Sequence, residues 1–254
     1  MENSSNYTVR LRVAVSGLYS AWAEVNFSVS YTEPAKPELV FVPDNEKSTI
    51  TVYIENPAPT GTEPNVTTQD LYRRRKGKNT WTKLAEHLQP NGFFIDYTPA
   101  HDTEYEYYVF VRGDNETRTN SDTFTSSVKV KHVLLSLANN LPEQVRLYMN
   151  PDKTFDTSFN ATTKRFAGRR FPVTEFGETL ETTGSISYLV REDTLDRLHD
   201  FLKRQETLLY RDSRGRKKFV TVSNISVNDH QLIDLYTVDL SLTEVDYHEG
   251  VTDD

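Results

Sequence analysis

The chain has 254 residues, no cysteine and a net charge of −8 at pH 7. The lack of cysteine excludes disulfides, thiolate catalysis and cysteine-ligated zinc, and the acidic balance argues against specific nucleic-acid binding. No apolar run approaches the roughly 18 residues of a membrane-spanning helix. The length predicts one or two domains, and the abundant Thr, Ser, Tyr and Phe favour β-strands.

The first 33 residues contain two alternating runs, 7–15 and 22–31, linked through Gly17. The first run, YTVRLRVAVSG, shares its pattern with YEYYVFVRG at 105–113, since each is a tyrosine-led strand that ends at a glycine. The two copies are about one β-sandwich domain apart. We therefore expect residues 1–33 to be the C-terminal part of a sandwich domain whose other strands precede this sequence.

Residues 34–131 form the next predicted domain. Pro34 and Pro37 end the strand pattern and mark a stiff linker, because proline donates no ladder hydrogen bond. Short strands then alternate with turn signals, which is typical of an immunoglobulin-like sandwich. The predicted strands are Glu38–Val42, Thr49–Glu55, Asp70–Arg75, Thr80–Leu84, Phe93–Ile95, Tyr105–Val111 and Phe124–Lys131.

The order of landmarks in this domain resembles a fibronectin type III module. The landmarks are DLYRRR, WTKLAE, FIDYTP and TEYEYYVFV. The resemblance implies that Pro99 and Thr103 belong to the loop before the sixth strand, and that Tyr105 is a structural tyrosine corner. Its ring packs inward while its hydroxyl fixes the loop. The second strand lacks the core tryptophan common in the family, so Ile50 or Val52 has to fill that volume.

The pattern of residues 132–251 predicts one α+β domain. An apolar stripe at helical spacing indicates a helix that begins at the N-cap Asp193 and ends near Gln205. Residues 252–254 are expected to form a free tail. The predicted strands are His132–Leu137 and Gln144–Met149 around a turn at Pro142, then Thr179–Val190, Thr207–Arg211, Lys217–Asn224 and Leu232–Leu242.

Several short motifs have a plain structural interpretation. Residues 112–114 spell the integrin-binding tripeptide Arg-Gly-Asp, but a turn after a strand also selects Gly and Asp. Seven N-x-S/T sequons suit a glycosylated surface protein, yet a chain rich in Asn, Ser and Thr forms them freely. The six histidines lack metal-ligand spacing, and no nucleophile elbow or phosphate loop occurs. The sequence predicts no catalytic, cofactor or metal site.

Three basic clusters lie at or near predicted strand ends: Arg73–Lys76, Lys164–Arg170 and Arg211–Lys218. The simplest interpretation is that each is a solvated turn. A charged contact with an acidic partner subunit is the second interpretation. Nucleic-acid binding is the third, because few aromatic residues are interleaved.

Three pieces of the C-terminal domain follow one another: GRRFPVTEFGE at 168–178, LYRDSRGR at 209–216 and LTEVDYHEGV at 242–251. This succession, with a fibronectin-like module in front of it, resembles minor tail proteins of long-tailed bacteriophages, from the tail tip or baseplate. The resemblance covers roughly residues 131–251. It implies a distal-tail-like domain of the split-barrel type that builds rings.

Both resemblances together imply a mainly β protein, with fibronectin type III modules followed by an α+β split-barrel-like domain that carries one amphipathic helix. The implied function is a non-enzymatic structural component of the virion, which is extracellular when assembled. Its partners are other tail proteins and copies of itself in a ring, trimer or hexamer, with the sandwiches projecting outward. The candidate subunit contacts are Arg169, Arg170, Glu175, Tyr210, Arg211, Arg214 and Arg216.

Two alternatives stay open. The first alternative is that the sandwiches bind host-surface carbohydrate in a secreted or cell-surface adhesion protein. They are rich in aromatic residues, and aromatic rings on a protein surface stack on sugar rings. The chain also suits the accessory part of a secreted polysaccharide hydrolase whose catalytic domain lies elsewhere.

Overall fold

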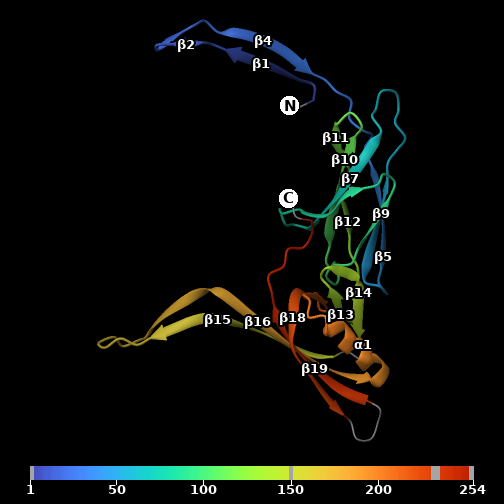
Figure 1. Ribbon diagram of the computed structural model, residues 1–254, viewed down its shortest axis with the longest axis vertical. Coiled ribbons are helices and arrows are strands. Elements are labelled where there is room, and N and C mark those ends of the chain that lie inside the picture. The colour runs from blue at the N-terminus through green and yellow to red at the C-terminus, as the bar shows by residue number, and fades with distance from the viewer. Residues whose placement is uncertain (1–2, 149–150, 230–234, 252–254) are drawn as a thin grey trace.

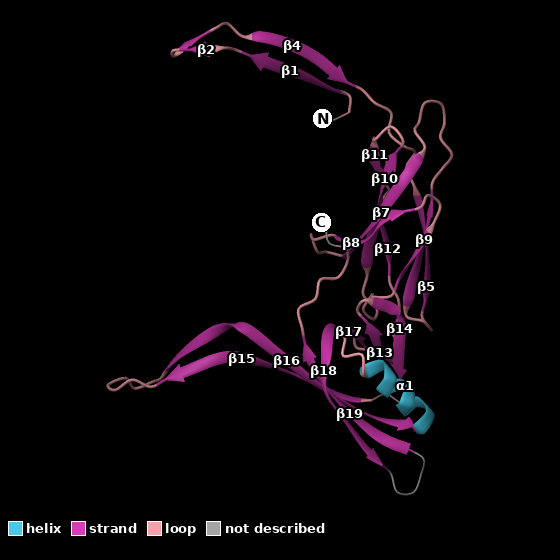
Figure 2. Cartoon of the chain, viewed as in Figure 1, coloured by secondary structure: helices cyan, strands magenta, loops and turns pink. Residues whose placement is uncertain are grey.

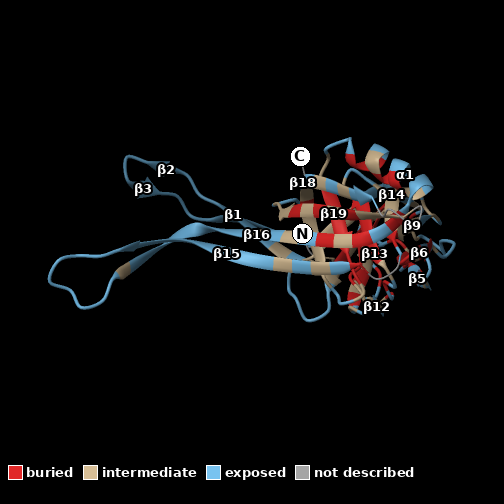
Figure 3. Cartoon of the chain, turned by 90° about the horizontal axis from the view of Figure 1, so that it is seen from below, coloured by how far each residue is buried: buried red, intermediate tan, exposed pale blue. Residues whose placement is uncertain are grey.

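A computed structural model describes residues 3–148, 151–229 and 235–251. The protein is mainly β, and the described residues contain one helix (Figure 2). An N-terminal hairpin, a β-sandwich and a C-terminal α+β domain follow one another along the chain (Figure 1). Two long hairpins leave the body of the molecule on the same side, as two perpendicular views show (Figures 1 and 3).

The N-terminal hairpin, which we call the first arm, is a two-stranded ribbon. β1 (Ser5–Leu11) pairs antiparallel with β4 (Ala23–Val29), and the tip carries the short pair β2 (Ala14–Val15) and β3 (Leu18–Tyr19). The alternation that predicted these strands is therefore confirmed as pairing. No second sheet covers the ribbon among the described residues, and nearly all of it is exposed (Figure 3).

Two antiparallel sheets form the sandwich. One has the order β5-β6-β9, and the other has the order β11-β10-β7-β8 with β12 also paired to β10. Their inner faces share one core, in which Ile50 and Val52 are both fully buried opposite Tyr107 and Val109 of the other sheet. The strands are β5 (Glu38–Asp44), β6 (Thr49–Glu55), β7 (Val66–Arg75), β8 (Thr82–Leu88), β9 (Phe93–Asp96), β10 (Tyr105–Gly113), β11 (Arg118–Asn120) and β12 (Phe124–Ser126).

The C-terminal domain is one antiparallel sheet with the order β14-β13-β17-β18-β19-β16-β15. Among the described residues β14 and β15 are its two edges. The helix α1 (Glu192–Leu202) packs its apolar stripe, including Leu198 and Phe201, into the core of this sheet. The strands are β13 (Val133–Leu137), β14 (Asn140–Leu147), β15 (Asp152–Lys164), β16 (Val173–Arg191), β17 (Leu208–Arg211), β18 (Lys217–Asp229) and β19 (Leu235–Glu244).

β15 and the outer half of β16 form the second arm. β16 pairs with β19 only from Thr183 inward, whereas β15 and β16 stay paired out to Lys164 and Val173. The ribbon therefore continues past the sheet as two strands alone (Figures 1 and 3). The alternating pattern predicted the inner half of β16, but β15 was missed, because its 13 residues contain little apolar alternation.

Other boundaries differ from the predictions. The helix begins at Glu192 and ends at Leu202, and its N-cap is Arg191 without a side-chain hydrogen bond, so the expected cap at Asp193 and end near Gln205 were wrong. Pro142 lies within the edge strand β14, where a missing donor is tolerated, and not in a turn. The predicted strand start at Leu232 and the tail 252–254 lie outside the described residues.

Candidate functional site

The sandwich and the C-terminal domain meet at a buried polar joint. Arg73, which lies on the core face of β7, donates to Asp96 at the end of β9, with 2.6 Å between Nη1 and Oδ2. Its other terminal nitrogen is 2.5 Å from Oε1 of Glu249 in the segment after β19. Oε2 of Glu249 is 2.5 Å from Nζ of Lys217 at the start of β18. One carboxylate therefore links a cation of each domain.

The segment that carries Glu249 returns from the end of β19 to the sandwich (Figure 1). Tyr247 packs on Phe219 with ring centroids 4.6 Å apart, and its hydroxyl donates to the carbonyl of Ala138. Val251 donates its backbone N–H to the carbonyl of Lys83 in β8 at 2.9 Å. These contacts fix the C-terminal segment across both domains.

The turn between β17 and β18 supplies the second half of the joint. Arg211 is fully buried, and its Nη1 donates to the backbone carbonyls of Ser48 (2.8 Å) and Pro99 (3.1 Å) in the sandwich. Asp212 is also fully buried and accepts hydrogen bonds from the Tyr210 hydroxyl at 2.9 Å and from the backbone of the turn, which closes at Gly215. The YRD-x-x-GR piece thus joins domains within one chain.

Burial and neighbouring charges shift the pKa values of the joint. Burial alone raises the pKa of Glu249, but the charges of Arg73 and Lys217 outweigh it and hold that pKa at about 2. Burial, helped by the charge of Arg73, lowers the pKa of Lys217 to about 8. Burial also lowers the pKa of Arg211 to about 10. At neutral pH the joint therefore holds Glu249 ionised between cations.

The sequence offered one signal for this joint. Arg73 shares the core face of β7 with Leu71, so the period of two that predicts the strand also places a charge inside the sandwich. A charge in that position needs a buried partner. The partner Glu249 is 176 residues away in the chain, and nothing in the sequence pattern points to it.

The structure divides the candidate subunit contacts into two groups. Tyr210 and Arg211 are fully buried in the joint, so neither side chain is exposed to a second subunit. Arg216 lies beside them, 3.6 Å from Asp212. The remaining candidates are exposed: Arg214 at the β17–β18 turn, Arg169 and Arg170 at the tip of the second arm, and Glu175 in β16 next to that tip. For the exposed group a subunit contact stays a prediction.

Each arm is an amphipathic ribbon with an uncovered apolar face. In the first arm the directly opposed pairs Val9–Val25 and Leu11–Ala23 lie on one face, and the polar pair Thr8–Asn26 lies on the other. Val9, Leu11 and Val25 are each more than half exposed. In the second arm the core face of β16 continues outward past the polar pair Thr157–Thr182 to the opposed pair Phe159–Leu180, which are 68% and 64% exposed.

Aromatic residues also gather on the outer face of the sandwich. Tyr72 and Tyr108 are opposed on β7 and β10 and stack with ring centroids 4.9 Å apart, and Trp81 meets Tyr108 edge-on at 4.6 Å. The Arg74 guanidinium lies 4.3 Å from the Trp81 ring centroid. The hydroxyl of Tyr105, on the inner face, accepts a hydrogen bond from the N–H of Ala100 and so holds the preceding loop.

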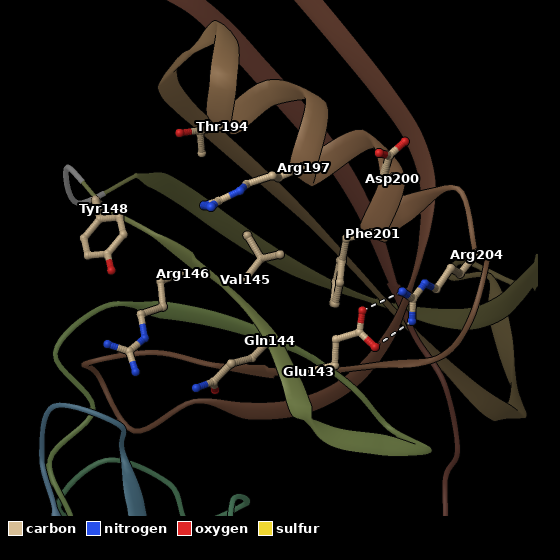
Figure 4. Close-up of a pocket in the computed structure, with 10 residues that line it drawn as sticks. All are labelled: Glu143, Gln144, Val145, Arg146, Tyr148, Thr194, Arg197, Asp200, Phe201 and Arg204. Atoms are coloured by element: carbon tan, nitrogen blue, oxygen red, sulfur yellow. Dashed lines mark hydrogen bonds and ion pairs between the residues drawn. The ribbon is translucent and has the colours of Figure 1, made fainter.

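A groove of about 660 Å³ lies between α1 and the edge strand β14 (Figure 4). Val145 and Phe201 supply its apolar lining. Glu143 and Arg204 close one end through a bidentate ion pair with N–O distances of 2.6 and 2.7 Å. Arg197 and Tyr148 also line the groove (Figure 4). A free strand edge beside a helix offers backbone hydrogen bonds to an added extended segment.

Other classes of site find no support in the described residues. They contain no group of three or more His, Asp or Glu side chains placed to hold a metal ion. None of their helices is long and apolar enough to cross a membrane. Comparison with known proteins adds no identification, since no protein family and no curated protein matches the chain.

Proposed function

We propose that this chain is a non-enzymatic structural subunit of a bacteriophage tail tip or baseplate, which assembles with copies of itself and with other tail proteins. The observation that carries the proposal is the pair of amphipathic arms, whose apolar faces no other described residue covers. A monomer gains nothing from a long ribbon with an exposed row of Val, Leu and Phe, whereas a neighbouring subunit buries it.

The buried joint supports the same proposal. Because Glu249, Arg73 and Arg211 tie the domains together, the sandwich and the C-terminal sheet with its arm keep a fixed relative orientation. Fixed orientation is what an assembly of defined symmetry requires. The free edges β14 and β15 offer further pairing surfaces, in line with a ring built through the C-terminal domain.

The assignment to a phage tail relies on the sequence resemblance. The strand order β5-β6-β9 against β8-β7-β10-β11 supports a fibronectin type III module, which suits the sandwich part of such proteins. The split-barrel-like nature of the C-terminal domain belongs to the same proposal. In the assembled virion the arms contact neighbours, and the sandwich projects outward.

Two measurements test the proposal. Light scattering coupled to size exclusion is expected to show a homo-oligomer, and immunogold electron microscopy with antibodies against residues 132–254 is expected to label the tail tip of particles from the source culture. A monomer at all concentrations would contradict the assembly role. Label on cell surfaces with bare particles would contradict the virion location.

A second candidate function is binding of host-surface carbohydrate. The favouring observation is the Tyr72–Tyr108–Trp81 cluster on the outer sandwich face, since aromatic platforms stack on sugar rings. A glycan array probed with the full chain and with Trp81→Ala is the test. Binding that the variant loses supports this function, and binding that it keeps removes the cluster from consideration.

A further inference from the structure

The tip of the second arm has a composition unlike the rest of the protein. Residues 164–171, KRFAGRRF, contain four basic residues, two phenylalanines and no acidic residue. They connect the end of β15 to the start of β16. The whole chain has a net charge of −8, so the chain without these four cations has a net charge of −12 (−8 − 4).

The phenylalanines and arginines of the tip are exposed together. Phe166 is 52% exposed and Phe171 is 73% exposed. The Arg169 guanidinium lies 5.8 Å from the Phe166 ring centroid, and that of Arg170 lies 5.6 Å from the Phe171 ring centroid. Each exposed ring therefore has a cation beside it.

Most of the tip's positive charge is unpaired. Lys164 forms an ion pair with Glu175 at 2.8 Å, at the foot of the tip. Arg165, Arg169 and Arg170 have no acidic partner among the described residues. Gly168, at φ +83°, and a backbone hydrogen bond from Arg169 to Phe166 make the turn that presents these side chains at the end of the arm.

The arm separates this charge from the acidic body. The two-stranded part of the ribbon extends over residues 157–164 of β15, which at about 3.3 Å per residue is a reach of roughly 26 Å. The Debye length is about 8 Å at physiological ionic strength. The negative charge of the body is therefore largely screened at the tip. An anionic surface that approaches the end of the arm meets the positive charge and the apolar rings of the tip.

We propose that the tip of the second arm, residues 164–171, binds the surface of membranes that contain anionic phospholipids. The phenylalanines enter the headgroup–acyl boundary, and the unpaired arginines bind lipid phosphates while their alkyl stems lie along the interface. A lipid surface uses both features of the tip, whereas a purely charged polymer in water leaves the two rings exposed. This inference does not depend on the assignment to a phage tail.

The test is cosedimentation of the full chain with vesicles of phosphatidylcholine alone or with 30% phosphatidylglycerol. Binding is expected only to the anionic vesicles and is expected to weaken as salt is raised. Phe166→Ser with Phe171→Ser is expected to weaken the partition constant about 10-fold or more. Arg165→Gln, Arg169→Gln and Arg170→Gln together are expected to weaken it about 100-fold, at about 5-fold for each charge.

Matched controls remove the same groups from exposed positions elsewhere. Phe93→Ser removes an exposed ring of the sandwich, and Arg75→Gln, Lys76→Gln and Lys78→Gln remove three cations from one sandwich turn. Both controls are expected to bind anionic vesicles as the wild type does. The tip contributes nothing to either buried core, so both tip variants should melt at the wild-type temperature.

Three results would overturn the proposal. The first is no binding to anionic vesicles. The second is equal binding by the tip and control variants. The third is vesicle binding that the phenylalanine variant retains in full, because the tip is then a general polyanion site. Binding of single-stranded oligonucleotides without vesicle binding is a case of the first result. None of these results bears on tail-tip immunogold labelling, so the two proposals fail independently.

Discussion

The interdomain joint and the first arm distribute polar and apolar groups in opposite ways. The joint encloses charged side chains such as Arg73 and Arg211, whereas the arm leaves Val9, Leu11 and Val25 in solvent. In the joint Arg73 and Lys217 share Glu249, and Arg211 donates to backbone carbonyls of the sandwich, so both domains contribute to this interface. The arm has an apolar face that nothing in the described part of the chain covers. The joint is thus a contact between two parts of the same chain, whereas the apolar face of the arm is exposed to solvent.

The same contrast separates stability from assembly. Removing a group from the joint leaves a buried charge without its partner, which costs free energy in the monomer. Removing an apolar group from an arm costs the monomer little, since that group is already in water. Substitutions in the two regions should therefore affect different measurements.

The largest expected effect is that of Glu249→Gln. This substitution leaves Arg73 and Lys217 buried with less compensating charge, and we expect the free energy of unfolding to fall by about 3–5 kcal/mol. Urea unfolding followed by the fluorescence of Trp81, in the sandwich, measures it. The control Glu244→Gln breaks the partly exposed pair with Lys218, and we expect a loss below about 1 kcal/mol. Equal losses would show that the joint is no more critical than a surface pair.

The pH dependence of stability sharpens the role of Glu249. Its pKa is about 2 in the folded protein against 4.5 for the ordinary carboxyl, so the unfolded chain takes up the proton first. The stabilisation is complete above about pH 4.5 and is lost as the pH falls toward 2, with a total of about 3 kcal/mol. The difference in unfolding free energy between wild type and Glu249→Gln should shrink over this window. A difference that stays constant with pH would rule out this titration.

Gly250→Val is expected to cost about 2 kcal/mol. Gly250 has φ +109°, and an added Cβ would collide with the carbonyl oxygen of Lys83, so the C-terminal segment has to move off β8. The control Gly61→Ala also has a positive φ, +64°, but has nothing within 4 Å of the added carbon, and it should cost about 1 kcal/mol. Urea unfolding distinguishes the two, and a larger loss in the control would be contrary to this account.

The smallest effect on stability is expected in the first arm. Val9→Thr with Val25→Thr keeps the shape of the opposed pair but makes it polar, and unfolding should change by less than about 0.5 kcal/mol. Self-association, followed by sedimentation velocity, should weaken about 10-fold or more, because the apolar face no longer gains from burial. Thr8→Val on the opposite face is the control and should leave association unchanged. If the double variant associates as the wild type does, the arm is not a subunit contact.

Most strands could be predicted because each carries its own alternating pattern. The Tyr105–Val111 prediction lies within β10, where burial alternates residue by residue, and the stripe Leu195–Leu198–Phe201–Leu202 defines α1. β15 carries no such pattern, since most of its length lies outside the core and selects no apolar face. The helix cap also escaped prediction, because β16 leads directly into α1 and leaves no separate cap residue.

The sequence by itself determined much of the local structure: where most strands run, that one helix belongs to the C-terminal domain, and that the basic clusters fall at or near strand ends. Only the tertiary structure decided what those clusters do. Arg73 and Arg211 come from clusters that resemble the cluster at 164–170 in sequence. Each of these two residues is buried at the contact with the other domain, whereas the cluster at 164–170 lies in solvent at the end of an arm. The physical reason is that burial depends on packing between segments far apart in the chain, as with Arg73 and Glu249, and no local pattern encodes that distance.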